Sequence, residues 1–424
     1  MMLGAFDQAL SSFGNFVFTI FGALLLDAVG FGQLAVIFAV YLIANGIVRS
    51  VTSDVYIVSP RDTDTALSST EAACIETCVL LSAVLAGVLA LASVGLSDLR
   101  GPLLVLCVCF PLLSLQDTLR YIAFGRGQPS LAVISDAVWT VATLAVVGVL
   151  AGTNNASTVS LVAAWAGTGA VAGILAFTMM RLPASLFAGR RQAKRIRRWL
   201  SEHRRLYPYY VVDTLAAQAS GALVLFLLTG ISGFVAAGAL RAAQLLFNPV
   251  VVLVNSVRIW AIPELVRAQV NGTRLWRRRS RQLAVVMTGA CAIWSAAVVL
   301  APAEVILKLL GESAATANGL LWPTAILVTV TGGVSTPIFA AIRSLGEAVW
   351  GLWARLISAS AMLVAAAVGA LLAAESGAAW GMALAMPIVA AASLFGLHRS
   401  IARARRRQVI DAEQQEPRAT RIIR

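Results

Sequence analysis

The sequence predicts an all-α polytopic membrane protein with twelve transmembrane helices in two six-helix bundles. Of its 424 residues, 59% are hydrophobic and only 12% are charged, whereas an average soluble protein is about 25% charged. The mean hydropathy is +0.83, and most of the charge lies in a few short runs. So few polar residues could not cover a soluble protein of this size, which excludes soluble enzymes, secreted disulfide scaffolds and disordered regulators.

Apolar segments long enough to cross a bilayer follow one another along nearly the whole chain. A helix crosses the hydrocarbon core with about 20 apolar residues. No segment shows the alternating pattern of an outer-membrane barrel, so every span is expected to be helical. The expected spans are 9–27, 34–58, 72–96, 102–123, 130–151, 159–180, 207–230, 234–262, 283–310, 318–342, 350–373 and 377–398.

The placement of basic residues predicts that both ends of the chain lie in the cytoplasm. With the N-terminus inside, the inner loops and the tail hold 26 Lys and Arg residues, and the outer loops hold only Arg100 and Lys308. Cytoplasmic loops of membrane proteins carry this excess of positive charge. Topology therefore accounts for most of the net charge of +13, and we expect no nucleic-acid partner.

A basic loop divides the spans six and six. The expected parts are an N-terminal bundle (1–180), a basic cytoplasmic linker (181–206), a C-terminal bundle (207–398) and a basic, disordered cytoplasmic tail (399–424). Two similar segments, one ending at Arg126 and the other at Arg343, lead from spans four and ten into inner loops, at an offset of 217 residues. Parallel repeats of six helices would place a substrate site between the halves; the alternative is that similar hydrophobic composition imitates a repeat.

The linker contains a candidate amphipathic helix. Ile196, Trp199, Leu200 and Leu206 are interspersed among its arginines, a pattern that predicts a helix lying on the inner leaflet. Anionic lipids, which attract basic segments at about 1 kcal/mol per residue, are therefore expected partners. Elsewhere, Gly169-Ala-Val-Ala-Gly173 is typical of close helix packing, and helix breakers such as Pro249 and Gly332-Gly333 fall inside spans.

Polar residues inside span eight predict an anion site. A charge near the bilayer centre costs about 2.5–3.5 kcal/mol on insertion scales, so such groups pair, line a wet cavity or have a function. Guanidinium groups in a central cleft would hold phosphate oxygens bidentately; the alternative is that each arginine only ties helices together. The candidate substrate-binding residues are Arg49 in span two, followed by Arg241, Gln244, Asn248, Asn255 and Arg258 in span eight.

Acidic residues also occur within spans. Asp117 and Arg120 are three residues apart on one helical face, and a local ion pair between them is the favoured interpretation. Glu76 and Asp136 lie in neighbouring spans.

The residues give no indication of a metal, a cofactor or an enzyme. The five cysteines lie inside spans, and the only histidines, His203 and His398, complete no metal-binding set. There is no phosphate-binding GxxxxGK[ST] loop and no HExxH motif. We expect no cofactor and no catalytic site.

Several loose motifs resemble the polysaccharide-transport (O-antigen flippase-like) branch of the multidrug/oligosaccharidyl-lipid/polysaccharide exporter superfamily. They begin with Asp7-Gln-Ala-Leu-Ser-Ser-Phe-Gly-Asn-Phe and Phe31-Gly-Gln-Leu-Ala. Leu115-Gln-Asp-Thr-Leu-Arg-Tyr-Ile-Ala-Phe-Gly-Arg-Gly-Gln-Pro and Gly238-Ala-Leu-Arg-Ala-Ala-Gln-Leu-Leu-Phe-Asn-Pro follow. The resemblance spans about residues 5–398, and the arginine-rich, lysine-poor usage suggests a high-GC bacterium.

The resemblance implies two six-helix bundles in a V-shape like that of MATE transporters, working by alternating access in the bacterial cytoplasmic membrane. The implied substrate is a polyprenyl-diphosphate-linked oligosaccharide moved to the outer leaflet, with cavity arginines on the diphosphate. Span one lacks the arginines of the peptidoglycan-precursor flippase, which favours surface-polysaccharide repeat units. Asp54, Asp117 and Asp136 are the candidate ion-coupling residues, and a polysaccharide polymerase and glycosyltransferases are candidate partners.

Two other functions remain open at this stage. A MATE-type drug or cation antiporter would need an acidic cavity, whereas span eight is basic. A non-transporting scaffold could recruit assembly enzymes through its basic loops. A cavity lined by Arg241 favours the flippase, and a closed, packed interior favours the scaffold.

Overall fold

The computed structural model describes residues 2–59, 68–183, 186, 190–216, 220–311 and 313–420. These ranges consist mainly of helices and contain no β-strand. Nine of their helices are long and apolar enough to cross a membrane. The chain is thus an all-α, multi-pass membrane protein. It forms two compact units: unit 1 comprises Met1–Leu245 and Pro302–Gly319, and unit 2 comprises Leu246–Ala301 and Leu320–Arg424.

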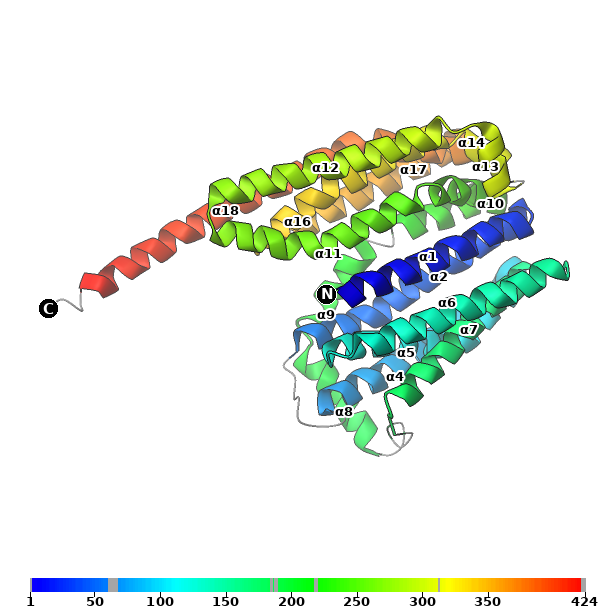
Figure 1. Ribbon diagram of the computed structural model, residues 1–424, viewed down its shortest axis with the longest axis horizontal. Coiled ribbons are helices and arrows are strands. Elements are labelled where there is room, and N and C mark those ends of the chain that lie inside the picture. Colours follow the sequence, from blue (N-terminus) through cyan, green and yellow to red (C-terminus); the bar gives the residue numbers. More distant parts are fainter. Residues whose placement is uncertain are drawn as a thin grey trace. The chain divides into compact units, whose positions relative to one another are not determined.

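Unit 1 contains most of the helices of the N-terminal half. In it, α5 packs against both α4 and α7, and α1 packs against α6 (Figure 1). Its elements are α1 (Met2–Leu25), α2 (Ala28–Val51), α3 (Ser53–Val58), α4 (Ser69–Ala92), η1 (Ser93–Gly95), η2 (Ser97–Leu99), α5 (Arg100–Gly125), α6 (Pro129–Gly152), α7 (Thr158–Met179), α8 (Arg190–Glu202), α9 (Tyr207–Thr214), α10 (Ser220–Leu245), α13 (Ala303–Leu310) and α14 (Ser313–Asn318).

Unit 2 contains a helix that changes from α-helical to π-helical and back to α-helical geometry. A π-helical segment, η5 (Thr329–Ser335), separates α15 (Leu321–Val328) from α16 (Thr336–Ser344). It contains Gly332 and Gly333, where the sequence indicated a flexible point. A Cβ on Gly333 would lie 2.7 Å from the Cα of Thr288, so only glycine permits this approach. The other helices are α11 (Asn248–Val270), α12 (Thr273–Val299), α17 (Ala348–Leu384) and α18 (Met386–Thr420).

Polar side chains fix where several helices begin. The carboxylate of Asp27 accepts a hydrogen bond from the backbone N–H of Gly30, 2.8 Å away, so α2 begins six residues before the expected start of span two. Ser68 and Glu71 form a reciprocal capping box at the start of α4. Such caps satisfy backbone N–H groups that have no partner within the helix.

The small residues of α7 pack closely, as the sequence predicted. A Cβ on Gly173 would lie 2.5 Å from the carbonyl oxygen of Leu112 in α5, and one on Gly169 would lie 2.4 Å from the Cδ2 of Leu113. Larger residues at either position would separate the two helices.

The expected span 234–262 is interrupted. The helical conformation is lost at Leu246 and Phe247, and α11 begins at Asn248. Pro249 explains the break because its ring has no N–H and would clash with the carbonyl of Leu245. The boundary between the two units falls at this break.

Helices α10 and α17 each bend sharply near a connection that the sequence predicted between two spans. Gly233 in α10 has φ +83° and ψ −179°, a conformation that is nearly restricted to glycine. In α17, Ala373 and Ala374 depart from helical geometry, at the expected connection between the last two spans.

Two basic segments are helical. In the linker, α8 packs on protein through Trp199, which is 2% exposed and belongs to a core cluster with Val55 and Ile75. Its indole Nε1 donates to the carbonyl oxygen of Val51, 3.0 Å away. In the basic tail, α18 continues to Thr420. Its alanine, arginine and glutamine residues favour helix.

Candidate functional site

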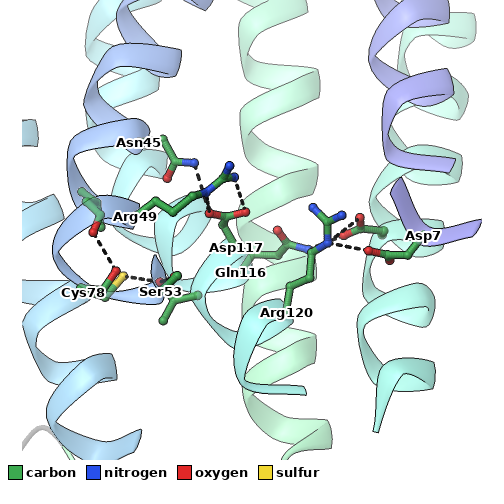
Figure 2. Close-up of polar contacts among 12 residues, drawn as sticks. Asp7, Asn45, Arg49, Ser53, Cys78, Gln116, Asp117 and Arg120 are labelled. Atoms are coloured by element: carbon green, nitrogen blue, oxygen red, sulfur yellow. Dashed lines mark hydrogen bonds and ion pairs between the residues drawn. The ribbon is translucent and has the colours of Figure 1, made fainter. Parts of the chain in front are cut away.

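Charged side chains of four apolar helices in unit 1, α1, α2, α5 and α6, form ion pairs between the helices (Figure 2). Arg49 of α2 grips the carboxylate of Asp117 of α5 with two hydrogen bonds, Nε to Oδ2 at 2.9 Å and Nη2 to Oδ1 at 2.8 Å. Asn45, one turn earlier in α2, donates to the same Oδ2 over 3.4 Å. The Arg49 guanidinium also lies over the ring of Tyr121, 5.3 Å from its centroid.

One turn further along α5, Arg120 forms ion pairs with residues of two other helices. Its Nε lies 2.6 Å from Oδ2 of Asp7 in α1 (Figure 2). The same Nε lies 3.6 Å from Oδ2 of Asp136 in α6. Gln116 of α5 donates to Oδ1 of Asp136 over 2.7 Å and to Ser135 over 3.2 Å. The favoured local pair of Asp117 with Arg120 is therefore wrong as the main interaction, because each residue has its ion partner on a different helix.

The polar network has more negative than positive groups. Three carboxylates, on Asp7, Asp117 and Asp136, face two guanidiniums, on Arg49 and Arg120. Asp7 is 0% exposed and Asp136 is 2% exposed. One oxygen of each, Oδ1 of Asp7 and Oδ2 of Asp136, is buried without a hydrogen bond. An uncompensated charge is expensive there, so the arrangement suits a bound proton or small cation.

A small polar cavity adjoins this network. It has a volume of about 10 Å³ and is lined by Asp136, Asn15 and Thr143 among others. A space of this size holds about one water molecule. A proton or a dehydrated ion could therefore reach Asp136, whereas a drug-sized molecule could not.

The structure places the three predicted ion-coupling residues in or near α2, α5 and α6. Asp117 and Asp136 belong to the network just described, and Asp54 lies in α3, which follows α2. Asp7 and Arg120 were not among the predicted site residues. Both interrupt otherwise apolar segments, and that interruption was the available signal.

A second group of ion pairs involves the N-terminal part of α4 and the residue that follows the C-terminus of α5. Arg126 donates to both carboxylate oxygens of Glu71, at 2.9 and 2.8 Å, and these bonds raise the pKa of Arg126 above its ordinary value. Arg195 of α8 pairs with Glu76, which is fully buried in α4. Hydrogen bonding to Glu76 also raises the pKa of Arg195. The intramembrane Glu76 therefore anchors the linker helix.

Arg241, the central residue of the predicted anion site, lies in α10 and is half-buried. Neither Arg241 nor Gln244 forms a hydrogen bond or an ion pair with any residue that the structure describes. Three residues before Arg241, Gly238 contacts the backbone of Gly32 in α2. The backbones of α2 and α10 therefore approach each other closely at Gly238, and no carboxylate among the described residues pairs with the guanidinium of Arg241.

The other predicted substrate-binding residues are distributed differently. Arg49 is held by Asp117, as described. Asn248 is half-buried at the start of α11, so the expected continuous polar stripe from Arg241 is interrupted by the break before it. Asn255 and Arg258 lie within α11, but their side chains are outside the described part of the structure.

The described residues contain no group of three His, Cys, Asp or Glu side chains placed to hold a metal. The five cysteines are free thiols. Cys78 accepts a hydrogen bond from Thr118 over 3.2 Å, which connects α4 with α5.

Solved structures with the same fold are transporters of the MOP superfamily. The chain matches the lipid II flippase MurJ in its inward closed conformation with TM-score 0.66 and 12% identity over 96% of this chain and 90% of that chain. It matches an inward-facing multidrug resistance MATE family transporter with TM-score 0.64 and 11% identity over 94% of each chain. The Vibrio cholerae MATE transporter VcmN gives TM-score 0.63 and 15% identity over 94% of this chain and 95% of that chain.

These identities establish the fold alone. No protein-family model matches the sequence, and no curated protein matches it either. The solved structures that share this fold are those of transporters and of a flippase.

Proposed function

We propose that this protein is a flippase that moves a polyprenyl-diphosphate-linked oligosaccharide from the inner to the outer leaflet. The observation that carries the proposal is Arg241, a half-buried arginine in an apolar helix that has no partner among the described residues. An unpaired guanidinium inside a membrane is costly, and a diphosphate would supply the charge-assisted, bidentate bonds that it lacks. The solved flippase with this fold, MurJ, is named for lipid II, a lipid-linked substrate.

The proposal extends to the membrane arrangement. In it, twelve spans form two six-helix bundles, with both termini in the cytoplasm of a bacterium and the substrate moving by alternating access. The excess of inner Lys and Arg residues supports this orientation. The substrate is a repeat unit of a surface polysaccharide, and its polymerase and glycosyltransferases are the proposed partners.

The remaining substrate contacts are assigned by chemistry. Gln244 shares a helical face with Arg241, and Asn248, Asn255 and Arg258 follow it in the sequence. We assign Gln244 and these three residues to the oligosaccharide–diphosphate, with Arg241 on the phosphate oxygens. Arg49 would also contact the substrate once its ion pair with Asp117 is broken.

The network of Asp7, Arg120 and Asp136 is proposed to couple transport to an ion gradient. Its uncompensated carboxylate and the adjoining cavity of about 10 Å³ suit one proton or one small cation. Asp117 joins this network to Arg49, so loading of the ion would change the balance of charge around the arginine proposed to contact substrate. Asp54 is the third candidate for this role.

A small-molecule antiporter is the second candidate, because two solved structures with this fold are of a multidrug resistance MATE family transporter. Such a protein would bind cations, and an unpaired arginine would repel them. Another solved structure with this fold, a MOP superfamily transporter from Pyrococcus furiosus, is described as having a binding pocket of reversed polarity. Pocket charge therefore varies between proteins of this fold.

Depletion of the protein in its host tests the proposal. We expect lipid-linked oligosaccharide to accumulate in the cytoplasmic leaflet, and we expect wild type and Arg204→Gln to restore export, because Arg204 is exposed on the surface. Arg241→Gln should fail to restore it. Unchanged lipid-linked oligosaccharide together with increased sensitivity to cationic dyes would support the antiporter instead.

A further inference from the structure

Unit 2 contains a pocket that the proposed transport site does not use. It has a volume of about 560 Å³ and lies between α12, the η5–α16 segment and α18. That volume is within the range of ligand sites, about 300–1,000 Å³. We call it the α12–α18 pocket.

One wall of the α12–α18 pocket is basic and polar. Arg277, Ser280 and Arg281 line it from one face of α12, at spacings of three and four residues. Both arginines are exposed, and neither forms an ion pair or a hydrogen bond with the described residues. The hydroxyl oxygen of Ser280, between them, is buried and has no hydrogen-bond partner. This serine hydroxyl can donate to an anion held by the two guanidiniums.

The rest of the pocket is apolar. Its lining includes Pro337 and Ile338 of α16 and Leu394, Leu397 and Ile401 of α18. The hydrogen bond from Trp276 Nε1 to Ser344 Oγ, 2.9 Å long, fixes α12 against α16 at this end. The apolar part adjoins the η5 segment through Thr288 and Val334, where the hydroxyl of Thr288 donates to the carbonyl oxygen of Gly333 over 2.9 Å.

The pocket lies at one boundary of the apolar spans. Arg277 and Arg281 are near the start of the span Thr273–Val299, and His398 is near the end of the span Val349–Ala404. The first turns of α12 are basic, from Arg274 to Arg281, and this end of the helix is expected to be cytoplasmic. The basic wall is thus expected at the level of the inner-leaflet head groups, with the apolar part extending from it.

We propose that the α12–α18 pocket binds an anionic glycerophospholipid of the inner leaflet. Its phosphate would lie against Arg277, Ser280 and Arg281, and one acyl chain would occupy the apolar part. Charge complementarity selects this occupant: arginine grips phosphate oxygens bidentately, the unpaired serine hydroxyl supplies a further donor, and the apolar lining excludes a free phosphate or a nucleotide. This site is separate from Arg241 and does not depend on the proposed function.

Native mass spectrometry of the purified full-length protein tests the proposal with phosphatidylglycerol as the probe. Arg277→Gln/Arg281→Gln should weaken binding about tenfold or more, given the attraction of each basic residue to anionic lipid. The matched control is Arg278→Gln/Arg279→Gln, which removes the same charge from exposed neighbours that do not line the pocket. It should change binding less than twofold.

A second variant tests the apolar part without altering charge. Ala284→Phe would fill the pocket, and it should reduce phosphatidylglycerol binding while leaving the thermal unfolding temperature near that of the wild type. Equal losses in the two double variants would overturn the proposal, because binding would then follow net charge alone. Tighter binding of a polyprenyl phosphate than of phosphatidylglycerol would also overturn it, since the pocket would then serve the transported lipid. Phosphatidylcholine should not compete.

Discussion

Arg49 in α2 and Asp117 in α5 form a bidentate ion pair across the interior of unit 1, with nitrogen–oxygen distances of 2.9 and 2.8 Å. The pair joins two apolar helices, and Asn45 also donates to the aspartate. It therefore holds a candidate substrate-binding arginine in place next to the acidic network of Asp7 and Asp136.

Removal of one partner of this pair should destabilise unit 1. Breaking a fully buried pair costs about 3–5 kcal/mol, but the Arg49 side chain is 29% exposed, so we expect about 2 kcal/mol for Arg49→Gln or Asp117→Asn. The double variant should lose less than the sum, because neither charge is left alone. SDS titration in mixed micelles measures the free energy of unfolding of the two single variants and the double variant. If the two single losses simply add up in the double variant, the two residues are not coupled.

Asp136→Asn should abolish the response of transport to an ion gradient. The substitution removes one of three carboxylates that face two guanidiniums, so the network no longer needs a proton or a cation. Stability should stay within about 1 kcal/mol of the wild type, since the lost charge was not fully compensated. Transport into vesicles with an imposed proton or sodium gradient is the readout. A full response to either gradient in the variant would place coupling elsewhere.

Arg120→Gln is the contrasting variant for the same network. It removes the guanidinium that lies 2.6 Å from Asp7 and 3.6 Å from Asp136, and leaves two buried carboxylates to repel each other. We therefore expect a clear loss of stability, larger than that of Asp136→Asn, in the same SDS titration. If Arg120→Gln were the more stable of the two, the charge assignment of the network would be wrong.

Arg195→Gln should loosen helix α8. Arg195 pairs with the fully buried Glu76, and loss of the pair leaves that carboxylate alone in α4. Hydrogen exchange in Arg190–Glu202 should become faster, while exchange in α6 stays unchanged. Arg198→Gln is the control because its pair with Glu202 is largely exposed, at 75% and 51%, and exposed pairs contribute little. Equal exchange rates in the two variants would argue against anchoring by Glu76.

Gly32→Ala should disrupt the contact between α2 and α10. A Cβ on Gly32 would lie only 1.9 Å from the carbonyl oxygen of Phe234, and overpacking of this kind costs about 1–3 kcal/mol. Gly148→Ala in α6 is the control, because a Cβ there meets nothing within 4 Å. The thermal unfolding temperature should fall for Gly32→Ala, and it should remain unchanged or rise for Gly148→Ala.

The helical architecture could be predicted from hydropathy because bilayer thickness sets the length of each apolar segment. Turns at Gly233 and near Ala373 fell where the sequence placed connections. The interruption before Asn248 was harder to predict, because Pro249 was recognised as a breaker while its surroundings remained apolar. Hydropathy averages over a window and does not resolve a two-residue turn.

The sequence shows which charged residues lie in the candidate site, but it does not show which of them form ion pairs with each other. Intramembrane charges such as Arg49, Asp117 and Glu76 stand out in a sequence because they are costly there. Their partners lie 68 and 119 residues away in the chain, and only the packing of the helices brings them together. The local spacing of Asp117 and Arg120 therefore suggested the wrong pair.

Reconstitution of the purified protein into liposomes tests the central claim most directly. Polyprenyl-diphosphate-linked oligosaccharide would be placed in one leaflet, and its arrival in the other would be followed with an impermeant glycan-modifying reagent. We predict transfer by the wild type and by Arg204→Gln, and little transfer by Arg241→Gln, although all three proteins unfold at similar temperatures. Equal transfer by Arg241→Gln and wild type would contradict the anion site at Arg241, and no transfer by folded wild type would contradict the flippase itself.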